Sequence, residues 1–347
     1  MRPSVSVLID TYNHEKYIEQ CVLSAVEQDF PASDYEIVVV DDGSADKTPE
    51  IVRRIAARPS RPVLIRLVRK TNGGQASAFN AGVPEARGEI VAFLDGDDWF
   101  APGKLTAVTM ALEQHPEAVA VGHGLYDFDE RTHEVKILAP AQKEFVHLGN
   151  PEAAAHAMSA WQFVLMGALT VRRNMLEQLM PVPESLVFCA DAPISWGAVA
   201  GGLLLLPEPL FYYRHHPDNL FSPDRGRTEQ LQRRYQMIEF AYASTESLLI
   251  RLGVKRDCAR SLLYPQWVTF SRTGLSTYGG ARLQALRTEM RDFGLEYPNP
   301  TVRYRLFKYA VVGAATLLLS PKAFYRARDW YFRRNLGRIR EHIARAR

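Results

Sequence analysis

Cysteines and long apolar runs are scarce in this chain of 347 residues, and each scarcity excludes a class of protein. The three cysteines, Cys21, Cys189 and Cys258, are too few and too far apart for a disulfide framework or a cysteine metal site. No apolar run reaches the roughly 18–20 residues that span a bilayer. A strand pattern begins as early as Val5, which leaves no room for a signal peptide. We therefore expect a cytoplasmic protein.

Net charge is also small, but it is unevenly distributed. The formal net charge is +3, yet residues 301–347 carry twelve lysines and arginines against two acids, Asp329 and Glu341. The tail is therefore about +10 and the rest of the chain about −7. A basic tail on an acidic body is typical of a protein with a polyanionic partner, such as an anionic membrane surface or a nucleic acid.

The basic tail combines its cations with apolar and aromatic residues. Residues 310–319 have low polarity; this run is too short to span a membrane but suits an interfacial helix. Phe324, Tyr325 and Trp330 follow among further arginines, a composition that fits a helix on anionic lipid. Two interpretations stay open. The tail attaches peripherally to the inner face of the cytoplasmic membrane, or it packs on the protein or across a dimer.

Strand and helix patterns alternate along the first 125 residues. Short apolar runs occur at 4–9, 36–40, 63–68, 90–94 and 118–121, with helical periodicity between them at 17–25, 48–55, 76–83 and 103–114. This alternation predicts an α/β fold with a doubly wound, mostly parallel sheet and helices on both faces. Thr48 before Pro49 is typical of a helix cap.

The rest of the chain is less regular. We expect loops or antiparallel strands at 125–144, helices at 153–165 and 174–180, strands at 203–206 and 210–213, a long amphipathic helix at 229–252, and mostly helix at 257–291. One domain is expected over residues 1–222, with two halves that meet near residue 125. A helical extension at 223–300 and the basic amphipathic helical tail at 301–347 follow.

The strand pattern at Ile90–Leu94 ends in three carboxylates, Asp95, Asp97 and Asp98. Ligands bind outside the carboxyl ends of strands in open α/β sheets, and a divalent cation relieves the repulsion among such crowded charges. Mg²⁺ and Mn²⁺ prefer carboxylate and phosphate oxygens, and Gly96 lets a ligand approach the backbone. The alternative is an acidic, solvated turn, since isolated Asp-x-Asp triplets are common.

Polar residues also follow the other expected strands. Thr11, Tyr12 and Asn13 follow the first, Asp41 and Asp42 the second, and Asn72 and Gly74 the third. A tyrosine ring can stack on a base, amides and carboxylates can bond a base or ribose, and loop N–H groups can face phosphate. Ordinary helix-entry loops, Asx turns and connectors are the alternatives. Asn80, inside a helix, either bridges to the third loop or bonds backbone.

These motifs occur together in a known order. They are Ser6–Ile9, Thr11–Asn13, Val39–Ser44, Asn72–Gly74, the Ala78, Asn80 and Gly82 spacing, and Phe93–Asp98. Over about the first 100 residues the chain resembles the family-2 glycosyltransferases, and Asp191 with Tyr213–His216 extends the resemblance to about residue 220. The resemblance implies the GT-A fold, Mn²⁺ or Mg²⁺, and an inverting transfer of a sugar from a nucleoside diphosphate, UDP by default, to an acceptor hydroxyl.

The resemblance also assigns roles to individual residues. Nucleotide binding falls to Thr11, Tyr12, Asn13, Asp41, Asp42, Asn72, Gly74, Asp95 and Gly96, the metal to Asp95, Asp97 and His216, and the acceptor or sugar pocket to Asp98 and Trp99. His216 is favoured over His215 because a proline-containing turn follows it. Trp99 could equally be core packing, and Trp161 and Trp196 are expected in the core. The chain departs from the family at Asp10, where proline is usual.

Asp191 is the candidate catalytic base. It lies among apolar residues, which raise the pKa of a carboxyl group and suit it to accept a proton. The family usually has a pair of acids here, but Ala190 stands in place of the first. The alternative role, capping a helix that starts near Pro193, is compatible with catalysis.

Two other enzyme classes would require motifs that this chain lacks. A nucleotidyltransferase would carry a glycine-rich loop with basic residues after the first strand, and a dinucleotide oxidoreductase would need G-x-G-x-x-G; the chain has neither there. A non-catalytic nucleotide-sugar-binding scaffold at a membrane stays open. The resemblance places the donor in residues 1–125 and the acceptor and base in 126–222. It implies a glycan or lipid-linked acceptor in cell-surface polysaccharide, lipopolysaccharide or glycolipid synthesis, and no nucleic acid.

Overall fold

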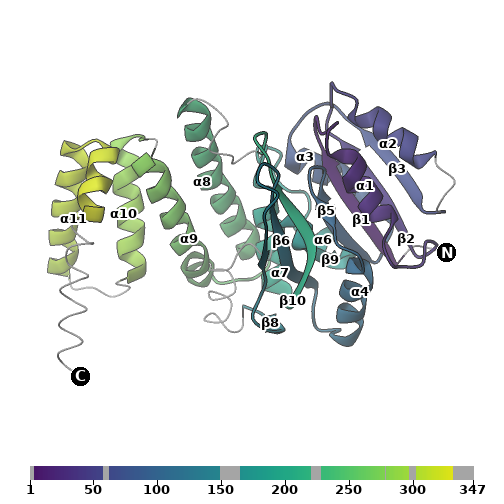
Figure 1. Cartoon of the computed structure of the whole chain (residues 1–347). Helices are drawn as coiled ribbons and strands as arrows, with labels where there is room; N and C mark the ends of the chain where they lie inside the picture. Colours follow the sequence, from purple (N-terminus) through teal and green to yellow (C-terminus); the bar gives the residue numbers. More distant parts are fainter. Residues whose placement is uncertain are drawn as a thin grey trace. The chain divides into compact units, whose positions relative to one another are not determined.

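The apolar runs near the start of the chain form four parallel strands of one sheet (Figure 1). They are β1 (Val5–Thr11), β2 (Tyr35–Asp41), β3 (Leu64–Arg69) and β4 (Ile90–Asp95), in the spatial order β3-β2-β1-β4. The structure is a computed structural model that describes residues 4–57, 62–148, 165–219, 228–277, 279–296 and 302–330. In these residues the sheet continues through β9 (Thr170–Arg172), β6 (Ala120–Asp129), β10 (Leu203–His215) and β5 (Trp99–Phe100).

Both strand directions occur in the second half of the sheet. β9 is antiparallel to its neighbours β4 and β6, whereas β6 and β10 are parallel to each other. β7 (Val135–Leu138) pairs with β6 and β8 (Glu144–Val146) with β10, both antiparallel. Residues 125–144 therefore contain antiparallel strands, one of the two expected arrangements. The predicted fold class, an α/β protein with a mostly parallel sheet, is confirmed.

Helices cover both faces of the sheet because the strand residues alternate in direction. Val7 and Ile9 of β1 share a core cluster with Ile18 and with residues of the other helices on that face, which are α1 (Ile18–Val26), α2 (Thr48–Ala56) and α4 (Lys104–Gln114). Leu8, between them, points to the opposite face, where α3 (Gln75–Glu85) packs so closely that a Cβ at Gly82 would lie 2.5 Å from it. The second half contributes α6 (Arg173–Leu179) and α7 (Asp191–Gly201), which pack on each other.

Two local expectations are wrong. The strands expected at 203–206 and 210–213 are one strand, β10, since register shifts on either side of Pro209 accommodate a residue that cannot donate a ladder hydrogen bond. Thr48 does not cap α2, because the helix already begins at Thr48 and its N-cap is Lys47. The Thr48 hydroxyl instead accepts a hydrogen bond from the His14 N–H at 2.9 Å. The expected helix at 153–165, with Trp161, lies outside the described residues.

The chain divides into two units: unit 1 spans Met1–Arg225 and Ala241–Ala259, and unit 2 spans Gly226–Phe240 and Arg260–Arg347. The sheet belongs to unit 1. The remaining helices are α8 (Thr228–Arg251), α9 (Arg256–Thr277), α10 (Arg282–Glu296), α11 (Val302–Leu318) and a helical segment at 321–330. Within the described parts of these helices, none is both long enough and apolar enough to cross a membrane.

Candidate active site

The carboxyl ends of β1, β2 and β4 meet at one edge of the sheet. Thr11 of β1 is level with Asp41 of β2, and Asp10 of β1 is level with Asp95 of β4. Adjacent parallel strands end on the same side, so the loops that follow them share that edge. The sheet topology therefore gathers the polar residues that end these three strands.

Asn13 joins the loop after β1 to the loop after β2. Its backbone N–H donates to Ser44 Oγ at 2.8 Å, and its Oδ1 accepts a hydrogen bond from the Ala45 N–H at 2.9 Å. Asn13 has a left-handed backbone (φ 55°), which asparagine adopts more readily than most residues. The neighbouring Tyr12 is 46% exposed, so its ring is accessible from solvent.

Asp41 is fully buried, and both of its carboxylate oxygens have partners. Oδ2 accepts a hydrogen bond from Arg69 Nε at 2.7 Å, and Oδ1 accepts one from the Ser44 N–H at 2.9 Å. Arg69 also donates to the Ser44 carbonyl oxygen at 3.1 Å. Asp41 thus ties the loop after β2 to β3.

Asp42 organises the glycine-containing loop after β3. Its carboxylate accepts hydrogen bonds from the N–H groups of Gly73 at 3.0 Å and Gly74 at 2.7 Å, and it pairs with Lys70 Nζ at 2.5 Å. Asn72 is packed beside Gly43, where a Cβ would lie 2.8 Å from the Asn72 backbone nitrogen. The N–H groups of Gly73 and Gly74 therefore bind a carboxylate of the protein rather than facing open space.

The same glycine turn positions the segment that precedes Asp191. Gly74 has φ +84°, and a Cβ there would lie 2.5 Å from Val187, so no other residue fits without displacement. The Gln75 N–H donates to the Val187 carbonyl oxygen at 2.9 Å, and Gln75 Oε1 accepts from the Ala190 N–H at 3.0 Å. The start of α3 thereby holds the start of α7 at the same edge.

The turn after β4 is fixed by the end of β1. The Gly96 N–H donates to the Asp10 carbonyl oxygen at 2.9 Å, and the Asp98 N–H donates to the Asp95 carbonyl oxygen at 3.0 Å. A Cβ at Gly96 would lie 2.5 Å from Thr11 Oγ1. The missing side chain at Gly96 therefore admits Thr11 of the protein itself, which is a different reason for glycine from the expected approach of a ligand.

Asp97 faces two histidines. His216 Nε2 lies 3.0 Å from Asp97 Oδ2, and His14 Nε2 lies 3.9 Å from the same oxygen. His215 instead pairs with Asp127 Oδ1 at 2.5 Å. Of the two adjacent histidines, His216 is therefore the one that reaches the acidic turn, because successive residues at the end of β10 point to opposite faces.

Arg214 clamps the acidic turn from β10. Its backbone N–H donates to Asp98 Oδ1 at 2.8 Å, and its Nε donates to the Asp97 carbonyl oxygen at 2.8 Å. Its guanidinium also donates to Gln20 Oε1 at 2.6 Å and lies 4.4 Å from the centre of the Trp99 ring, a cation–π contact. A buried arginine with this many partners holds Asp97 and Asp98 in place.

The structure distinguishes between the interpretations that the sequence left open for Asn80 and Trp99, and it tests the core position expected for Trp196. The Asn80 amide bonds backbone at both ends: Nδ2 donates to the Val182 carbonyl oxygen at 2.7 Å, and Oδ1 accepts from its N–H at 2.8 Å. Trp99 stacks on Tyr212 with ring centroids 4.6 Å apart, which supports a packing role. Trp196 is 3% exposed, so the expected core position is confirmed.

The acidic turn carries more negative charge than its surroundings neutralise. Burial and the neighbouring carboxylates raise the pKa values of Asp95 and Asp98 well above the ordinary range. Burial and the charge of Asp97 raise the pKa of Asp10 to about 7, although Asp10 and Asp95 hydrogen-bond each other. Burial opposes ionisation of Asp97, but His14 and the bond from His216 lower its pKa. Added positive charge would stabilise this cluster.

The donor atoms at this edge suit a hard divalent cation. Asp10 Oδ1 and Asp98 Oδ2 are buried and have no hydrogen-bond partner, and carboxylate oxygens are what Mg²⁺ and Mn²⁺ prefer. Among the described residues, no three His, Cys, Asp or Glu side chains are already arranged as a complete metal site. The two observations agree, since such cations commonly take one or two carboxylates and complete their shell with substrate phosphates and water.

Asp191 begins α7 next to this cluster. Burial raises its pKa, and its charge in turn helps to raise the pKa of Asp95, so the two carboxylates lie within electrostatic reach. The N-cap of α7 is Ala190, and the cap has no side-chain hydrogen bond. Asp191 is thus the first residue of α7 rather than its N-cap, and its carboxylate accepts hydrogen bonds from the backbone N–H groups of Ala192 and of Asp191 itself.

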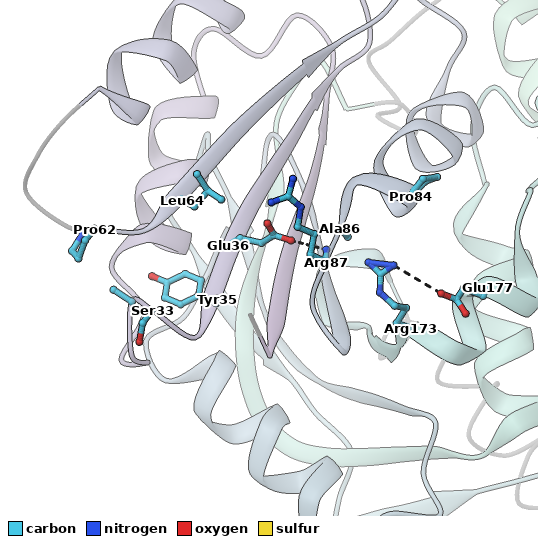
Figure 2. A pocket seen from close by; sticks show the side chains of 11 residues that line it. Ser33, Tyr35, Glu36, Pro62, Leu64, Pro84, Ala86, Arg87, Arg173 and Glu177 are labelled. Carbon is cyan, nitrogen blue, oxygen red and sulfur yellow. Dashed lines mark hydrogen bonds and ion pairs between the residues drawn. The ribbon is translucent and has the colours of Figure 1, made fainter. Parts of the chain in front are cut away.

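A hollow of about 660 Å³ lies at the opposite edge of the sheet (Figure 2). Tyr35 and Glu36 at the start of β2, and Arg87 before β4, contribute to its lining. Glu36 has partners for both oxygens: Oε1 accepts from Ser6 Oγ at 2.8 Å and from the Arg87 N–H at 2.6 Å, and Oε2 accepts from Arg66 at 2.9 Å. This edge holds none of the predicted site residues.

Comparison with known proteins places the chain in a family. A family model described as glycosyl transferase family 2 matches residues 6–179. An uncharacterized glycosyltransferase of Nostoc sp. (strain PCC 7120) is 32% identical over 276 residues, which cover 78% of this chain and 83% of that protein. The chain belongs to glycosyl transferase family 2.

Further comparisons agree with this membership. The uncharacterized glycosyltransferase EpsJ of Bacillus subtilis is 32% identical over 250 residues, covering 68% of this chain and 69% of its own length. The crystal structure of Staphylococcus aureus TarS 1–349 in complex with UDP-GlcNAc has a TM-score of 0.55 at 21% identity, over 84% of this chain and 89% of that one. The likeness shows that this family-2 glycosyltransferase has the GT-A fold.

Three parts of this glycosyltransferase's site were missed from the sequence. They are His14 beside Asp97, the Arg214 clamp, and the Gln75 contact to the segment before Asp191. Arg214 belongs to the Tyr213–His216 segment that resembles the family, but the resemblance assigned no role to its side chain. His14 directly follows the Thr11–Asn13 motif, but its neighbour Asp97 is 83 residues away in sequence, so nothing local pointed to it.

Proposed function

We propose that this family-2 glycosyltransferase transfers a sugar, with inversion, from a nucleoside diphosphate to an acceptor hydroxyl in a divalent-metal-dependent reaction. The observation that carries the proposal is the gathering of Asp95, Asp97 and Asp98 with Asp191 at the carboxyl edge of the sheet. Among the described residues, this edge combines carboxylates that lack a neutralising partner with a separate, half-buried acid. The first set suits a metal and a leaving diphosphate, and the second suits proton transfer.

Donor binding falls to the loops after β1, β2, β3 and β4. The predicted contacts are Thr11, Tyr12, Asn13, Asp41, Asp42, Asn72, Gly74, Asp95 and Gly96, with UDP as the expected nucleotide. The exposed ring of Tyr12 supports base stacking. Asp41, Asp42 and Asn13 are largely occupied by the protein, so we infer that they act by shaping the loops that meet the nucleotide.

The metal role falls to Asp95, Asp97 and His216, with Mn²⁺ or Mg²⁺ as the expected ion. When bound, such an ion offsets the negative charge that develops on the departing diphosphate. His216 and Arg214 keep Asp97 in place through a 3.0 Å side-chain contact and a 2.8 Å bond to its carbonyl oxygen. Asp98 and Trp99 remain the expected border of the acceptor or sugar pocket.

Asp191 acts as the general base in this proposal. The acceptor oxygen forms a bond to the anomeric carbon while the bond from that carbon to the diphosphate oxygen breaks, and the hydroxyl proton passes to Asp191. The electron pair of the broken bond leaves with the diphosphate. A pKa raised by burial favours proton acceptance, and attack opposite to the leaving group inverts the anomeric configuration.

The acceptor class is a glycan or a lipid-linked glycan, as in cell-surface polysaccharide, lipopolysaccharide or glycolipid synthesis. The basic tail supports a cytoplasmic enzyme attached peripherally to the inner face of an anionic membrane. No nucleic-acid partner is included, because the proposed site is acidic and would repel phosphate backbones in the absence of a bound cation.

A panel of nucleotide sugars tests the proposal. Purified full-length protein is incubated with each donor and Mn²⁺, Mg²⁺ or chelator, and both nucleoside diphosphate release and thermal shift are followed. We expect one donor class to give metal-dependent release that chelator abolishes. Stabilisation by a donor without any release, with or without candidate acceptors, would favour a binding scaffold. Release of pyrophosphate from nucleoside triphosphate and sugar phosphate would favour a nucleotidyltransferase.

A further inference from the structure

Among the described side chains of helix α11, at residues 310–318, one apolar face is packed and a second is exposed. Val312 and Ala315 lie against a cluster of Leu275, Ala285, Phe324 and Tyr325 within unit 2. The other face carries Val311, Leu317 and Leu318, which are 51%, 57% and 78% exposed. Figure 1 shows α11 beside α10 at the C-terminal end of the described helices. Burying one face of α11 thus leaves a second stripe of aliphatic side chains in solvent.

The exposed residues form a continuous stripe because of their helical spacing. Val311, Ala314 and Leu318 follow one another at intervals of three and four residues, and Leu317, three residues after Ala314, widens the stripe at its end. A Cβ at Gly313 would meet nothing within 4 Å, so this side of the helix is open among the described residues. Contiguous apolar surface of this kind marks an interaction site rather than ordinary exposure.

Positive charge follows the stripe in sequence. Arg326 is exposed and Lys322 half-buried on the next helical segment, and neither forms an ion pair within the described residues. The nearby acid Glu289 is already engaged, since both of its oxygens accept hydrogen bonds from Arg272 at 2.8 Å. Residues 301–347 carry twelve lysines and arginines against two acids, so this segment has a net charge of about +10.

We propose that this stripe of α11, formed by Val311, Ala314, Leu317 and Leu318, inserts into the interfacial layer of an anionic lipid bilayer. The helix lies in the membrane plane, its aliphatic side chains reach the acyl boundary, and flanking cations contact headgroup phosphates. The described part of α11 is too short and too polar to cross the bilayer. The inference deepens the proposed function by naming the surface that brings the enzyme to a lipid-linked acceptor.

An anionic bilayer fits the stripe better than other occupants do. Two copies of this chain would bring two segments of about +10 together, and the repulsion would oppose association through this face. A nucleic acid would use the cations but offers nothing to a row of leucines. Anionic lipid satisfies both features, since its headgroups attract the cations and its acyl chains accept the aliphatic side chains.

Vesicle co-sedimentation of the full-length protein tests the surface. The vesicles contain phosphatidylcholine alone or phosphatidylcholine with phosphatidylserine. The key variant is Leu317→Ser with Leu318→Ser, and its matched control is Val135→Ser with Ile137→Ser on β7, where the side chains are 50% and 62% exposed. We expect the wild type and the control to pellet with anionic vesicles, and the leucine variant to lose at least about tenfold in apparent affinity.

A charge variant separates the electrostatic contribution to vesicle binding from the apolar one. Arg326→Glu should weaken pelleting with anionic vesicles and reduce its sensitivity to salt, because one cation near the headgroups has been reversed. Its binding to phosphatidylcholine alone should not change. Equal pelleting of the wild type and the leucine variant overturns the proposal. So does a lipid-free dimer, measured by light scattering, that the leucine variant dissociates, because the stripe would then belong to a second copy.

The outcome is separable from that of the proposed enzymatic function. The leucine variant lies outside the catalytic machinery, so its nucleoside diphosphate release with a soluble acceptor or water should match the wild type. Vesicle binding without any release of nucleoside diphosphate would support the membrane-binding surface and contradict the enzymatic proposal. Release of nucleoside diphosphate by a wild-type protein that does not bind vesicles would support the enzymatic proposal and contradict the membrane-binding surface.

Discussion

Both edges of the sheet in unit 1 contain buried carboxylates, but they differ in whether the carboxylate oxygens have hydrogen-bond partners. At the amino edge, both oxygens of Glu36 are bonded, to Ser6, Arg66 and the Arg87 N–H (Figure 2). At the carboxyl edge, Asp10 Oδ1 and Asp98 Oδ2 are buried without a partner. A buried charge that the protein neutralises stabilises the fold, whereas one left unneutralised is held ready for a ligand. The contrast therefore separates a structural acid from functional ones.

The sharpest test of the contrast is Asp191→Asn. Removing the base should lower kcat by about 10³-fold while donor affinity stays near normal, because the amide cannot accept the hydroxyl proton. The free energy of unfolding should change little, since the asparagine amide oxygen can still accept the hydrogen bond from the Ala192 N–H. Steady-state kinetics and a donor thermal shift measure both quantities.

Its matched control is Glu184→Gln, an exposed acid seven residues earlier in the same segment. That change should leave kcat and stability as they are. An Asp191→Asn protein that turns over at the wild-type rate would remove the base from the mechanism.

Glu36→Gln should behave in the opposite way at the other edge. It leaves Arg66 without the carboxylate 2.9 Å away, so the free energy of unfolding should fall by about 2–3 kcal/mol. Arg66 is partly exposed and keeps Glu85 at 3.2 Å, which is why the loss stays below that of a fully buried pair. Urea unfolding measures it.

Turnover per folded Glu36→Gln molecule should be unchanged, because this edge holds none of the proposed site. Glu85→Gln, at the exposed partner of Arg66, should cost no more than about 0.5 kcal/mol. A large kcat loss in Glu36→Gln with normal stability would erase the distinction between the two edges.

Arg214→Lys probes how the carboxyl edge is held. The lysine keeps the charge but loses the fork that bonds the Asp97 carbonyl oxygen and Gln20. We expect about 10- to 100-fold more Mn²⁺ to be needed for half-maximal thermal stabilisation in the presence of nucleoside diphosphate. Arg131→Lys, at an exposed arginine of the turn between β6 and β7, is the control. A purely structural clamp would lower stability without moving the Mn²⁺ midpoint.

Asp10→Asn should change the pH dependence of stability. The pKa of Asp10 is about 7 in the folded protein, compared with about 3.9 for an unfolded aspartate. Between these values the folded state keeps a proton that the unfolded state has lost. In chelator, stability should therefore fall as pH rises from about 4 to about 7 and then level off.

The Asp10→Asn protein should lose much of that slope and be more stable than the wild type at pH 8, because one repelling carboxylate is gone. Chemical denaturation across pH measures it. Ser33→Ala, remote from the acidic turn, should retain the wild-type slope. Identical pH profiles for the wild type and Asp10→Asn would mean that Asp10 does not titrate as its surroundings require.

Much of the fold was predictable because local periodicity reports burial directly. The runs at 36–40 and 90–94 became β2 and β4 within a residue or so at each end. The β10 strand was not predicted as one element, since its prolines interrupt the pattern and only pairing with β6 carries the chain through them. The packing of Trp99 was likewise undecidable, because Tyr212, its stacking partner, is 113 residues away.

The sequence by itself determined which strands end in polar residues, and a parallel sheet places such ends at one edge whatever else the chain does. It thereby determined the neighbourhood of Asp41, Asp95 and Asp97. Only the tertiary structure decided which groups neutralise which. Asp41 and Asp42 were paired within the protein, while Asp10 and Asp98 each kept an oxygen without a partner. The reason is that such partners belong to strands far apart in the sequence. Arg214 and Asp98 are separated by 116 residues, and no local sequence pattern carries information over that separation.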